Sequence, residues 1–237
     1  MAANALPSGI DALFTLAEDM ADGCHTYEVA IGILQNTEAR IRADLVAAQT
    51  AQTSFLTAKG AKPGFTTARQ VADSNAQALI GLSRDVPAPS LGGQWSAAWE
   101  ATGFPNQSLA VPSRSEERQA LLASLQPYFT ANPAKENAPL NVTAARAGTL
   151  FTALSDARSA ANANLTDIGQ KKALRDTTET RLRRRTRGLS DELGQLLEDD
   201  DPRWEAFGLV RPGGTDLPDR VEHLVLTASV PGTVLVD

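Results

Sequence analysis

Trp99-Glu-Ala-Thr-Gly-Phe104 returns 105 residues later as Trp204-Glu-Ala-Phe-Gly-Leu209. In both copies a glycine, Gly103 or Gly208, follows the tryptophan by four residues. Other short segments repeat in the same order: Leu6–Ser8 with Val111–Ser113, Leu56–Lys62 with Leu165–Lys171, and Gly81–Ser83 with Gly188–Ser190. Collinear matches at nearly constant separation indicate a tandem duplication of a unit of about 105 residues. Chance similarity between two alanine-rich helical stretches is the alternative.

Composition favours helices packed closely on one another. Hydrophobic residues make up 42% of the 237 residues and aromatic residues only 5%. The core must therefore come mainly from Leu, Ile, Val and Ala, which suits helix packing better than a β-sandwich. We expect an all-α helical bundle of two tandem repeats, with a short C-terminal β-hairpin. The predicted boundaries are 1–110 for the first repeat, 111–210 for the second (packed with the first as one bundle), 211–219 for a linker and 220–237 for the hairpin.

The first repeat carries an apolar residue at every seventh position, the spacing of a helical seam. The members of this row are Leu13, Met20, Tyr27, Leu34, Ile41, Ala48 and Phe55. The glycines at 23 and 32 predict a short helix that ends near residue 22, followed by a long one to Lys59. Pro63, between Gly60 and Gly64, predicts a break. Aspartate at Leu34, as at Leu182 in the second repeat, is expected to unfold the domain.

The second repeat has its own helix signals. Ser113 and Glu116 have the spacing of a capping box, and Pro127 should kink or shorten the helix that follows. Asn141 is the predicted N-cap of the next helical stretch, for which a hairpin near residues 169–172 is expected, with one continuous helix over 141–199 as the alternative. The Asp201-Pro202 pair predicts the start of the helix that carries Trp204.

The tryptophans and terminal glycines have two interpretations. Gly103 is well placed to end its helix in a left-handed conformation. Trp99 and Trp204, with their glycines Gly103 and Gly208, are predicted to be repeat-defining structural residues that close the end of each bundle. Because tryptophan is enriched at binding hot spots, an interaction surface formed with Trp95 is the alternative.

The residue pattern predicts no catalytic, cofactor-binding or metal-binding residues. Cys24 is the one cysteine, its neighbour is His25, and the other histidine is His223. A structural zinc site needs four ligands, so we interpret Cys24 as a buried core thiol. Neither histidine follows a glutamate by three residues, the pattern of di-iron bundles. The aspartates at 199–201 lack the spacing of a calcium loop.

A basic segment, Lys171–Arg187, is the one concentration of charge that could form an interaction site. Its candidate contact residues are Arg181, Arg183, Arg184, Arg185 and Arg187. Adjacent residues on a helix point about 100° apart, so a solvated face is the first interpretation. An acidic partner or polyanion is the second. Nucleic acid is disfavoured by the net charge of −6 and by the lack of interleaved aromatic residues.

The tail from Val221 to Asp237 resembles the first two strands of a fibronectin type III domain, and the helical part resembles uncharacterised bacterial proteins in which a helical region precedes such a domain. The resemblance implies that the chain is part of a longer protein, and it carries no known activity. The first residues show neither the basic region nor the apolar block of a signal peptide, which predicts a cytoplasmic protein. The fibronectin resemblance favours the cell surface or secretion as the alternative.

Three functions remain open from the sequence. The leading hypothesis is a non-enzymatic structural or protein-interaction module, a helical scaffold or spacer that carries a following β domain. The second is a binding protein that uses the basic helix to dock an acidic partner or polyanion. The third is an enzyme with a site between the repeats. Expected partners are another protein or a following domain of the same protein; no membrane span is expected, and the oligomeric state is left open.

Overall fold

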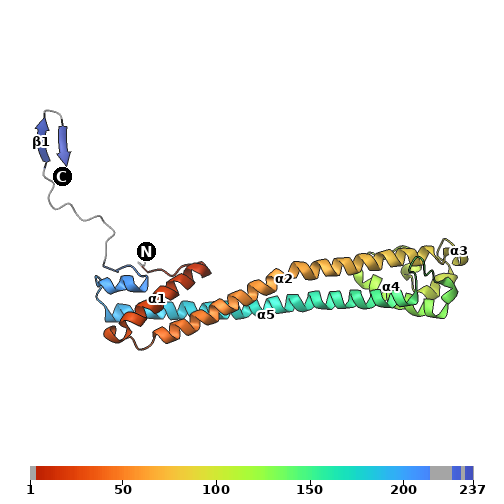
Figure 1. Ribbon diagram of the computed structural model, residues 1–237, viewed down its shortest axis with the longest axis horizontal. Helices are drawn as coiled ribbons and strands as arrows, with labels where there is room; N and C mark the ends of the chain where they lie inside the picture. Colours follow the sequence, from red (N-terminus) through yellow and green to blue (C-terminus); the bar gives the residue numbers. More distant parts are fainter. Residues whose placement is uncertain (1–3, 214–225, 231–232, 237) are drawn as a thin grey trace. The chain divides into compact units, whose positions relative to one another are not determined.

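The computed structural model describes residues 4–213, 226–230 and 233–236, and these residues are predominantly helical (Figure 1). The all-α prediction is confirmed at this level. The α-helices are α1 (Ile10–Ile31), α2 (Glu38–Asp85), α3 (Ala88–Leu91), α4 (Ser115–Ala131) and α5 (Ala144–Leu196). Short 3-10 helices are η1 (Ala97–Thr102), η2 (Pro105–Gln107), η3 (Pro133–Lys135) and η4 (Pro202–Phe207).

The chain forms two compact units, each with its own hydrophobic core. Unit 1 comprises residues 1–49 and 178–237, and unit 2 comprises residues 50–177. Each unit therefore takes segments from both predicted repeats. The core of unit 1 includes Leu13, Met20, Ile41, Leu182, Leu189, Trp204 and Phe207. The core of unit 2 includes Ala76, Ile80, Trp99, Leu122, Leu125, Phe129 and Leu154.

Helix α1 is longer than predicted and ends at a left-handed glycine. The predicted end near residue 22 is wrong: Gly23 lies inside α1, where a Cβ would meet the ring of Phe207 at 2.5 Å. The missing side chain thus allows η4 to pack against α1. The helix ends at Gly32, which has φ 88° and donates its backbone N–H to Glu28 O at 3.0 Å.

The seven-residue row crosses the connection between α1 and α2, and Leu34 falls in that connection. Its side chain is 75% exposed, whereas Met20 before it and Ile41 after it are fully buried. The expectation that aspartate at Leu34 would unfold the domain is therefore not supported by its position. Leu182, the other residue of that expectation, is fully buried.

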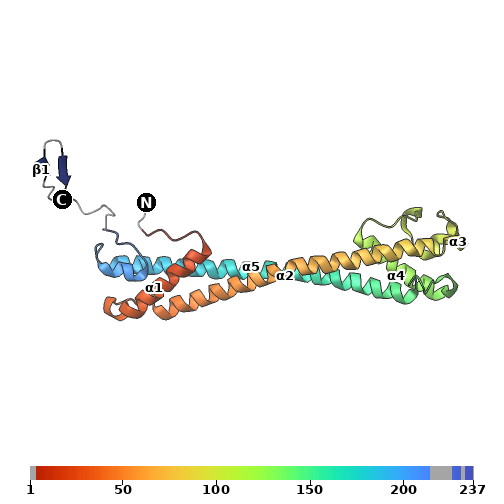
Figure 2. The same cartoon turned by 45° about the horizontal axis from the view of Figure 1, so that its top comes forward.

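The predicted break at residues 60–64 is wrong, because α2 runs through Pro63 (Figure 2). All residues from Lys59 to Gly64 are exposed, so the missing N–H of proline leaves no carbonyl buried without a partner. On either side, Ala58 and Ala72 are buried. We infer that packing on both sides of the proline holds the helix continuous.

Helix α5 is also continuous, so the hairpin near residues 169–172 is wrong and the alternative of one helix is correct. No proline interrupts this stretch, and ion pairs at the i, i+4 spacing stabilise the exposed surface. They join Lys171 to Asp167, Lys172 to Asp176, and Arg183 to Glu179.

Two predicted helix signals of the second repeat, the capping box of Ser113 and Glu116 and the N-cap at Asn141, are wrong. Helix α4 begins at Ser115, so Arg114 and not Ser113 is its N-cap residue, and no side chain caps it. The carboxylate of Glu116 pairs with Arg158 at 2.8 Å. Pro127 lies inside α4 with its ring exposed, and the helix continues to Ala131. The N-cap of α5 is Thr143, whose hydroxyl accepts the Arg146 N–H at 3.1 Å.

At the C-terminus, β1 (Leu226–Val230) pairs antiparallel with β2 (Thr233–Val236). The register shifts between Ala228 and Val230. The rest of the predicted 220–237 hairpin, including the turn between its strands, lies outside the described residues.

Candidate functional site

The five predicted interaction arginines fall into two groups, and two of them bind other parts of unit 1. Arg183 donates to the carbonyl oxygens of Pro7 and Ser8 at 2.5 and 2.8 Å. Arg185 donates its Nε–H to Asp44 at 3.0 Å and an Nη1–H to the side-chain oxygen of Asn36 at 3.2 Å. Asp44 is only 8% exposed, so Arg185 neutralises a buried carboxylate. Both side chains therefore have structural roles.

Arg181, Arg184 and Arg187 form the second group. All three are exposed, and none of them makes an ion pair or hydrogen bond within the described part of the chain. Arg181, Arg184 and Arg185 lie within four residues of one another, on one face of α5. Arg187 lies on the same helix but does not line the pocket described next.

The shared face of α5 and the connection before α2 form a pocket of about 500 Å³. Its lining consists of Gln35, Asn36, Arg181, Arg184, Arg185 and Gly188; we call it the basic pocket. Guanidinium groups present fixed forks of N–H donors that match carboxylate or phosphate oxygens. No acidic side chain lines the pocket, so its electrostatics favour an anion.

Glu192 holds the wall of the basic pocket in place. Its carboxylate accepts the backbone N–H groups of Leu34, Gln35 and Asn36 at 2.8, 2.9 and 2.9 Å. It also accepts the side-chain amide of Asn36 at 2.8 Å. Partial burial raises the pKa of Glu192, but these hydrogen bonds outweigh it and leave the pKa below its ordinary value. A single carboxylate on α5 thus fixes the connection between α1 and α2.

The two repeat-defining tryptophans, Trp99 and Trp204, are buried in equivalent local structures. Trp99 (0% exposed) donates its indole N–H to Gly92 O at 3.1 Å, and Trp204 (2% exposed) donates to Glu198 O at 3.0 Å. Each lies in a 3-10 helix that ends at a left-handed glycine, with φ 83° at Gly103 and 68° at Gly208. The prediction of a left-handed Gly103 is confirmed. Buried indoles are placed to close a core, and they are not available as a contact surface.

Cys24 is fully buried in unit 1, as predicted for a core thiol. Burial, together with the nearby carboxylates of Glu28 and Glu192, raises its pKa to about 12. Its neighbour His25 is exposed and contacts Glu38 at 3.1 Å. Among the described residues, no group of three or more His, Cys, Asp or Glu side chains could hold a metal ion.

The comparisons with known proteins return no relative: neither a protein-family model nor a curated protein nor a solved structure matches the chain. Across the described ranges, no helix has both the length and the hydrophobicity of a membrane span.

Sequence reasoning missed Gln35, Asn36 and Glu192. Glu192 lies more than 150 residues after the adjacent Gln35 and Asn36, so no local spacing connects it to them. The basic segment gave the only signal, and it did not distinguish the arginines that bind the protein from those that face solvent.

Proposed function

We propose that this protein is a non-catalytic helical module that acts through binding. The observation that supports this most directly is that buried charged side chains form ion pairs between helices. Asp44 on α2 pairs with Arg185 on α5, and Arg118 on α4 pairs with Asp73 on α2 and donates to Pro112 O at 2.6 Å. Each pair joins two helices, so each buried charge is matched by an opposite charge within the protein. Such charges stabilise packing and are not arranged to act on a substrate.

A screen of the purified chain against hydrolase, transferase and oxidoreductase substrates tests the non-catalytic proposal. We expect no turnover above that of a heat-unfolded sample. Turnover that copurifies with the folded chain, and that disappears when it is unfolded, would contradict the proposal.

The specific partner that the basic pocket favours is an acidic segment of another protein. Arg181 and Arg184 are exposed without an ion pair in the described chain, and the guanidinium of Arg185 lies beside them. Binding there would place carboxylates against unpaired guanidinium donors, at a cost in desolvation that is small for exposed groups. This proposal keeps the second hypothesis from the sequence, that the basic helix docks an acidic partner. It limits the contact residues to Arg181, Arg184 and Arg185.

Hexaglutamate is a suitable probe, titrated against the full chain at low and high salt. We expect Arg184→Glu to weaken binding at least tenfold, whereas Arg187→Glu, with the same change of charge outside the pocket, should have a much smaller effect. Binding should also weaken as salt screens the charges. Equal losses in the two variants, or equally tight binding of a single-stranded DNA oligomer, would contradict an acidic protein segment as the partner.

We further propose that the two repeats arose by duplication, on the basis of matching burial. Pairs of residues 105 apart are buried alike: Ala17 with Leu122, Met20 with Leu125, Cys24 with Phe129, and Phe104 with Leu209. In the long helices the separation is 106: Ala76 with Leu182, Ile80 with Thr186, and Ser83 with Leu189. The glycines matched in sequence, Gly81 and Gly188, are 107 residues apart, one residue more than the 106-residue separation of the buried pairs.

Coexpression tests whether the two proposed repeats are interleaved in one fold. Residues 1–110 and 111–213, produced as separate polypeptides, should assemble into one complex, because each compact unit takes segments from both. Two fragments that fold separately and do not associate would contradict it.

The antiparallel pairing of β1 with β2 supports the further proposal that the tail begins a fibronectin type III-like domain. The test of this proposal is whether the gene encodes further strands of that domain after residue 237.

A further inference from the structure

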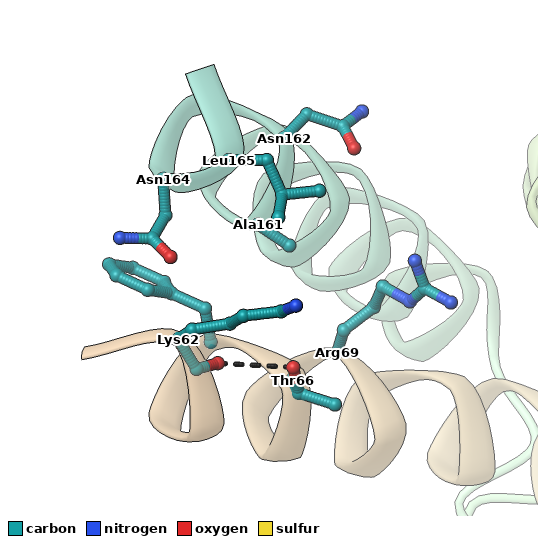
Figure 3. A pocket seen from close by; sticks show the side chains of 8 residues that line it. Lys62, Thr66, Arg69, Ala161, Asn162, Asn164 and Leu165 are labelled. Atoms are coloured by element: carbon teal, nitrogen blue, oxygen red, sulfur yellow. Dashed lines mark hydrogen bonds between the residues drawn. The ribbon is translucent and has the colours of Figure 1, made fainter. Parts of the chain in front are cut away.

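A second pocket, within unit 2, has a chemistry unlike that of the basic pocket. It has a volume of about 250 Å³ and lies between α2 and α5 (Figure 3). Its lining consists of Lys62, Phe65, Thr66, Arg69, Ala161, Asn162, Asn164 and Leu165. Two cations, an apolar wall and one buried amide thus meet in a space the size of a single amino-acid residue.

The cations share one face of α2. Lys62 and Arg69 are seven residues apart, which is close to two helical turns. Both are exposed, and neither makes an ion pair within the described ranges. Figure 3 shows the ammonium end of Lys62 pointing toward the side of the pocket where Arg69 rises. The nearby Asp73 forms its ion pair with Arg118, and the charge of Arg69 also acts on its carboxylate at longer range. An incoming carboxylate therefore meets two positive groups, neither of which is held in an ion pair within the described ranges.

Asn164 supplies an unused hydrogen-bond acceptor. The residue is only 8% exposed; its Nδ2–H donates to Ala58 O at 3.2 Å, while its buried Oδ1 has no hydrogen-bond partner. Buried polar atoms in folded proteins nearly always have a partner, and an orphan next to a pocket marks a place where a ligand can supply one. The ligand must bring a neutral N–H or O–H donor, since a second cation would be repelled by Lys62 and Arg69.

Apolar atoms complete the lining. Phe65 is half-buried on α2, and on α5 Leu165 is 51% exposed. The side chains of Leu165 and Ala161 point into the pocket (Figure 3). An exposed leucine beside a phenylalanine gains burial when an apolar group covers it, at roughly 25 cal/mol per Å² of apolar surface removed from water.

We infer that this pocket binds the free carboxylate of an N-acylated apolar amino acid, the chemistry of the last residue of a peptide with an apolar C-terminal side chain. The carboxylate lies between Lys62 and Arg69, the amide N–H donates to Oδ1 of Asn164, and the apolar side chain packs on Phe65 and Leu165. This site is independent of the basic pocket and of an acidic partner bound there.

N-acetyl-leucine is the probe, titrated against the ¹⁵N-labelled full chain and followed by amide chemical shifts. We expect saturable shifts in residues 62–69 and 161–165. N-acetyl-leucinamide, which lacks the charge, should bind at least tenfold more weakly. 4-Methylpentanoate, which keeps the carboxylate and apolar group but lacks the N–H, should bind about three- to tenfold more weakly, as one hydrogen bond to a buried acceptor implies.

Matched variants locate the site. The double variant Lys62→Gln/Arg69→Gln should reduce the affinity for N-acetyl-leucine to that for its amide, whereas Lys135→Gln/Arg114→Gln, with the same loss of charge elsewhere in unit 2, should leave it unchanged. N-acetyl-Gly-Gly-Leu separates the two sources of this chemistry: tighter binding than N-acetyl-leucine assigns a peptide end, and weaker binding a small metabolite. Acid and amide that bind alike, no binding of either at millimolar concentration, or shifts that map outside both segments would overturn the inference.

Discussion

A Cβ atom added at Gly208 would lie 2.9 Å from Cβ of Asp19, closer than real side chains approach. The equivalent atom at Gly103 would lie 2.3 Å from Cβ of Ser124. Asp19 lies on α1 and Ser124 on α4, and the two contacts are 105 residues apart in the chain. In each unit, a left-handed glycine thus allows the tryptophan-bearing turn to pack directly on a helix.

Alanine at either glycine should therefore destabilise its unit. Positive φ costs a non-glycine residue roughly 1–2 kcal/mol, and the close contact adds to this. We expect Gly208→Ala and Gly103→Ala each to lower the free energy of unfolding by about 2 kcal/mol or more, measured by urea denaturation with tryptophan fluorescence. Gly60→Ala is the control: it lies in α2 with open space around it, and should stabilise by about 0.5–1 kcal/mol. Unchanged stability in both Trp-turn variants would contradict the packing described.

Replacing Pro63 tests the continuity of α2. A proline inside a helix costs about 3 kcal/mol relative to alanine, partly offset by the entropy it removes from the unfolded chain. We expect Pro63→Ala to stabilise the protein by about 1–3 kcal/mol in the same assay. Pro202→Ala serves as the comparison, because proline is favourable at the first position of η4; this change should be neutral or mildly destabilising. No gain from Pro63→Ala would indicate a break in α2.

Glu192→Gln should weaken the connection between α1 and α2. The amide keeps the shape of the side chain but turns an NH₂ group toward donors that now bond a carboxylate. We expect a loss of about 1.5–3 kcal/mol, the range for hydrogen bonds to charged groups. Glu116→Gln, which removes an exposed ion pair with Arg158, should cost no more than about 0.5 kcal/mol. Equal effects of the two changes would count against the structural role of Glu192.

Acid should destabilise the protein, in part through Glu192. Its folded-state pKa is lowered, so the unfolded chain binds the proton more tightly. The stability that Glu192 contributes is complete above the unfolded pKa, about 4.3, and is lost as the pH falls through the folded pKa. The pKa of Asp201 is lowered to about 2 by Arg203, which extends the loss to lower pH. Denaturation at pH 7, 4 and 3 should show a smaller loss in Glu192→Gln than in the wild type; parallel losses would contradict the assignment.

Substitutions of the arginines of the basic pocket should differ in their effect on the free energy of unfolding, according to whether the arginine has a structural partner. Arg185→Gln leaves the buried Asp44 without its cation and should cost about 2–3 kcal/mol. Arg184→Gln should change the free energy of unfolding by less than about 0.5 kcal/mol. Both can be measured by urea denaturation at low salt. Loss of stability in Arg184→Gln would show that its guanidinium has a structural partner.

The sequence predicted the features that depend on a few neighbouring residues. Gly103 ends η1 in the left-handed conformation, and Asp201 caps η4 by accepting the N–H of Arg203 at 2.8 Å. Cys24, placed on the apolar row, is buried. Each of these outcomes follows from local backbone preferences or from a single periodic pattern.

Features that depend on distant packing were not predictable in this way. Pro63 and the glycines beside it are strong breaking signals, but burial of Ala58 and Ala72 on either side outweighs them. The carboxylate of Glu192 reaches backbone groups 156–158 residues earlier in the chain. Arg184 and Arg185 are neighbours, but Arg185 bonds Asp44 and Asn36, whereas Arg184 makes no ion pair within the described residues. Only the folded positions of Asp44 and Asn36 distinguish the two arginines.

The sealed thiol of Cys24 gives the protein a practical property. Because its side chain is fully buried and its pKa is about 12, Cys24 is almost entirely protonated at neutral pH. Alkylating dyes will therefore not react with it. Because the sequence holds no other cysteine, Gln35→Cys creates a unique reactive thiol in the lining of the basic pocket, while Cys24 and the pocket's arginines stay unchanged. An environment-sensitive fluorophore placed there would report, in real time and in a crude mixture, when the mouth of the basic pocket becomes covered.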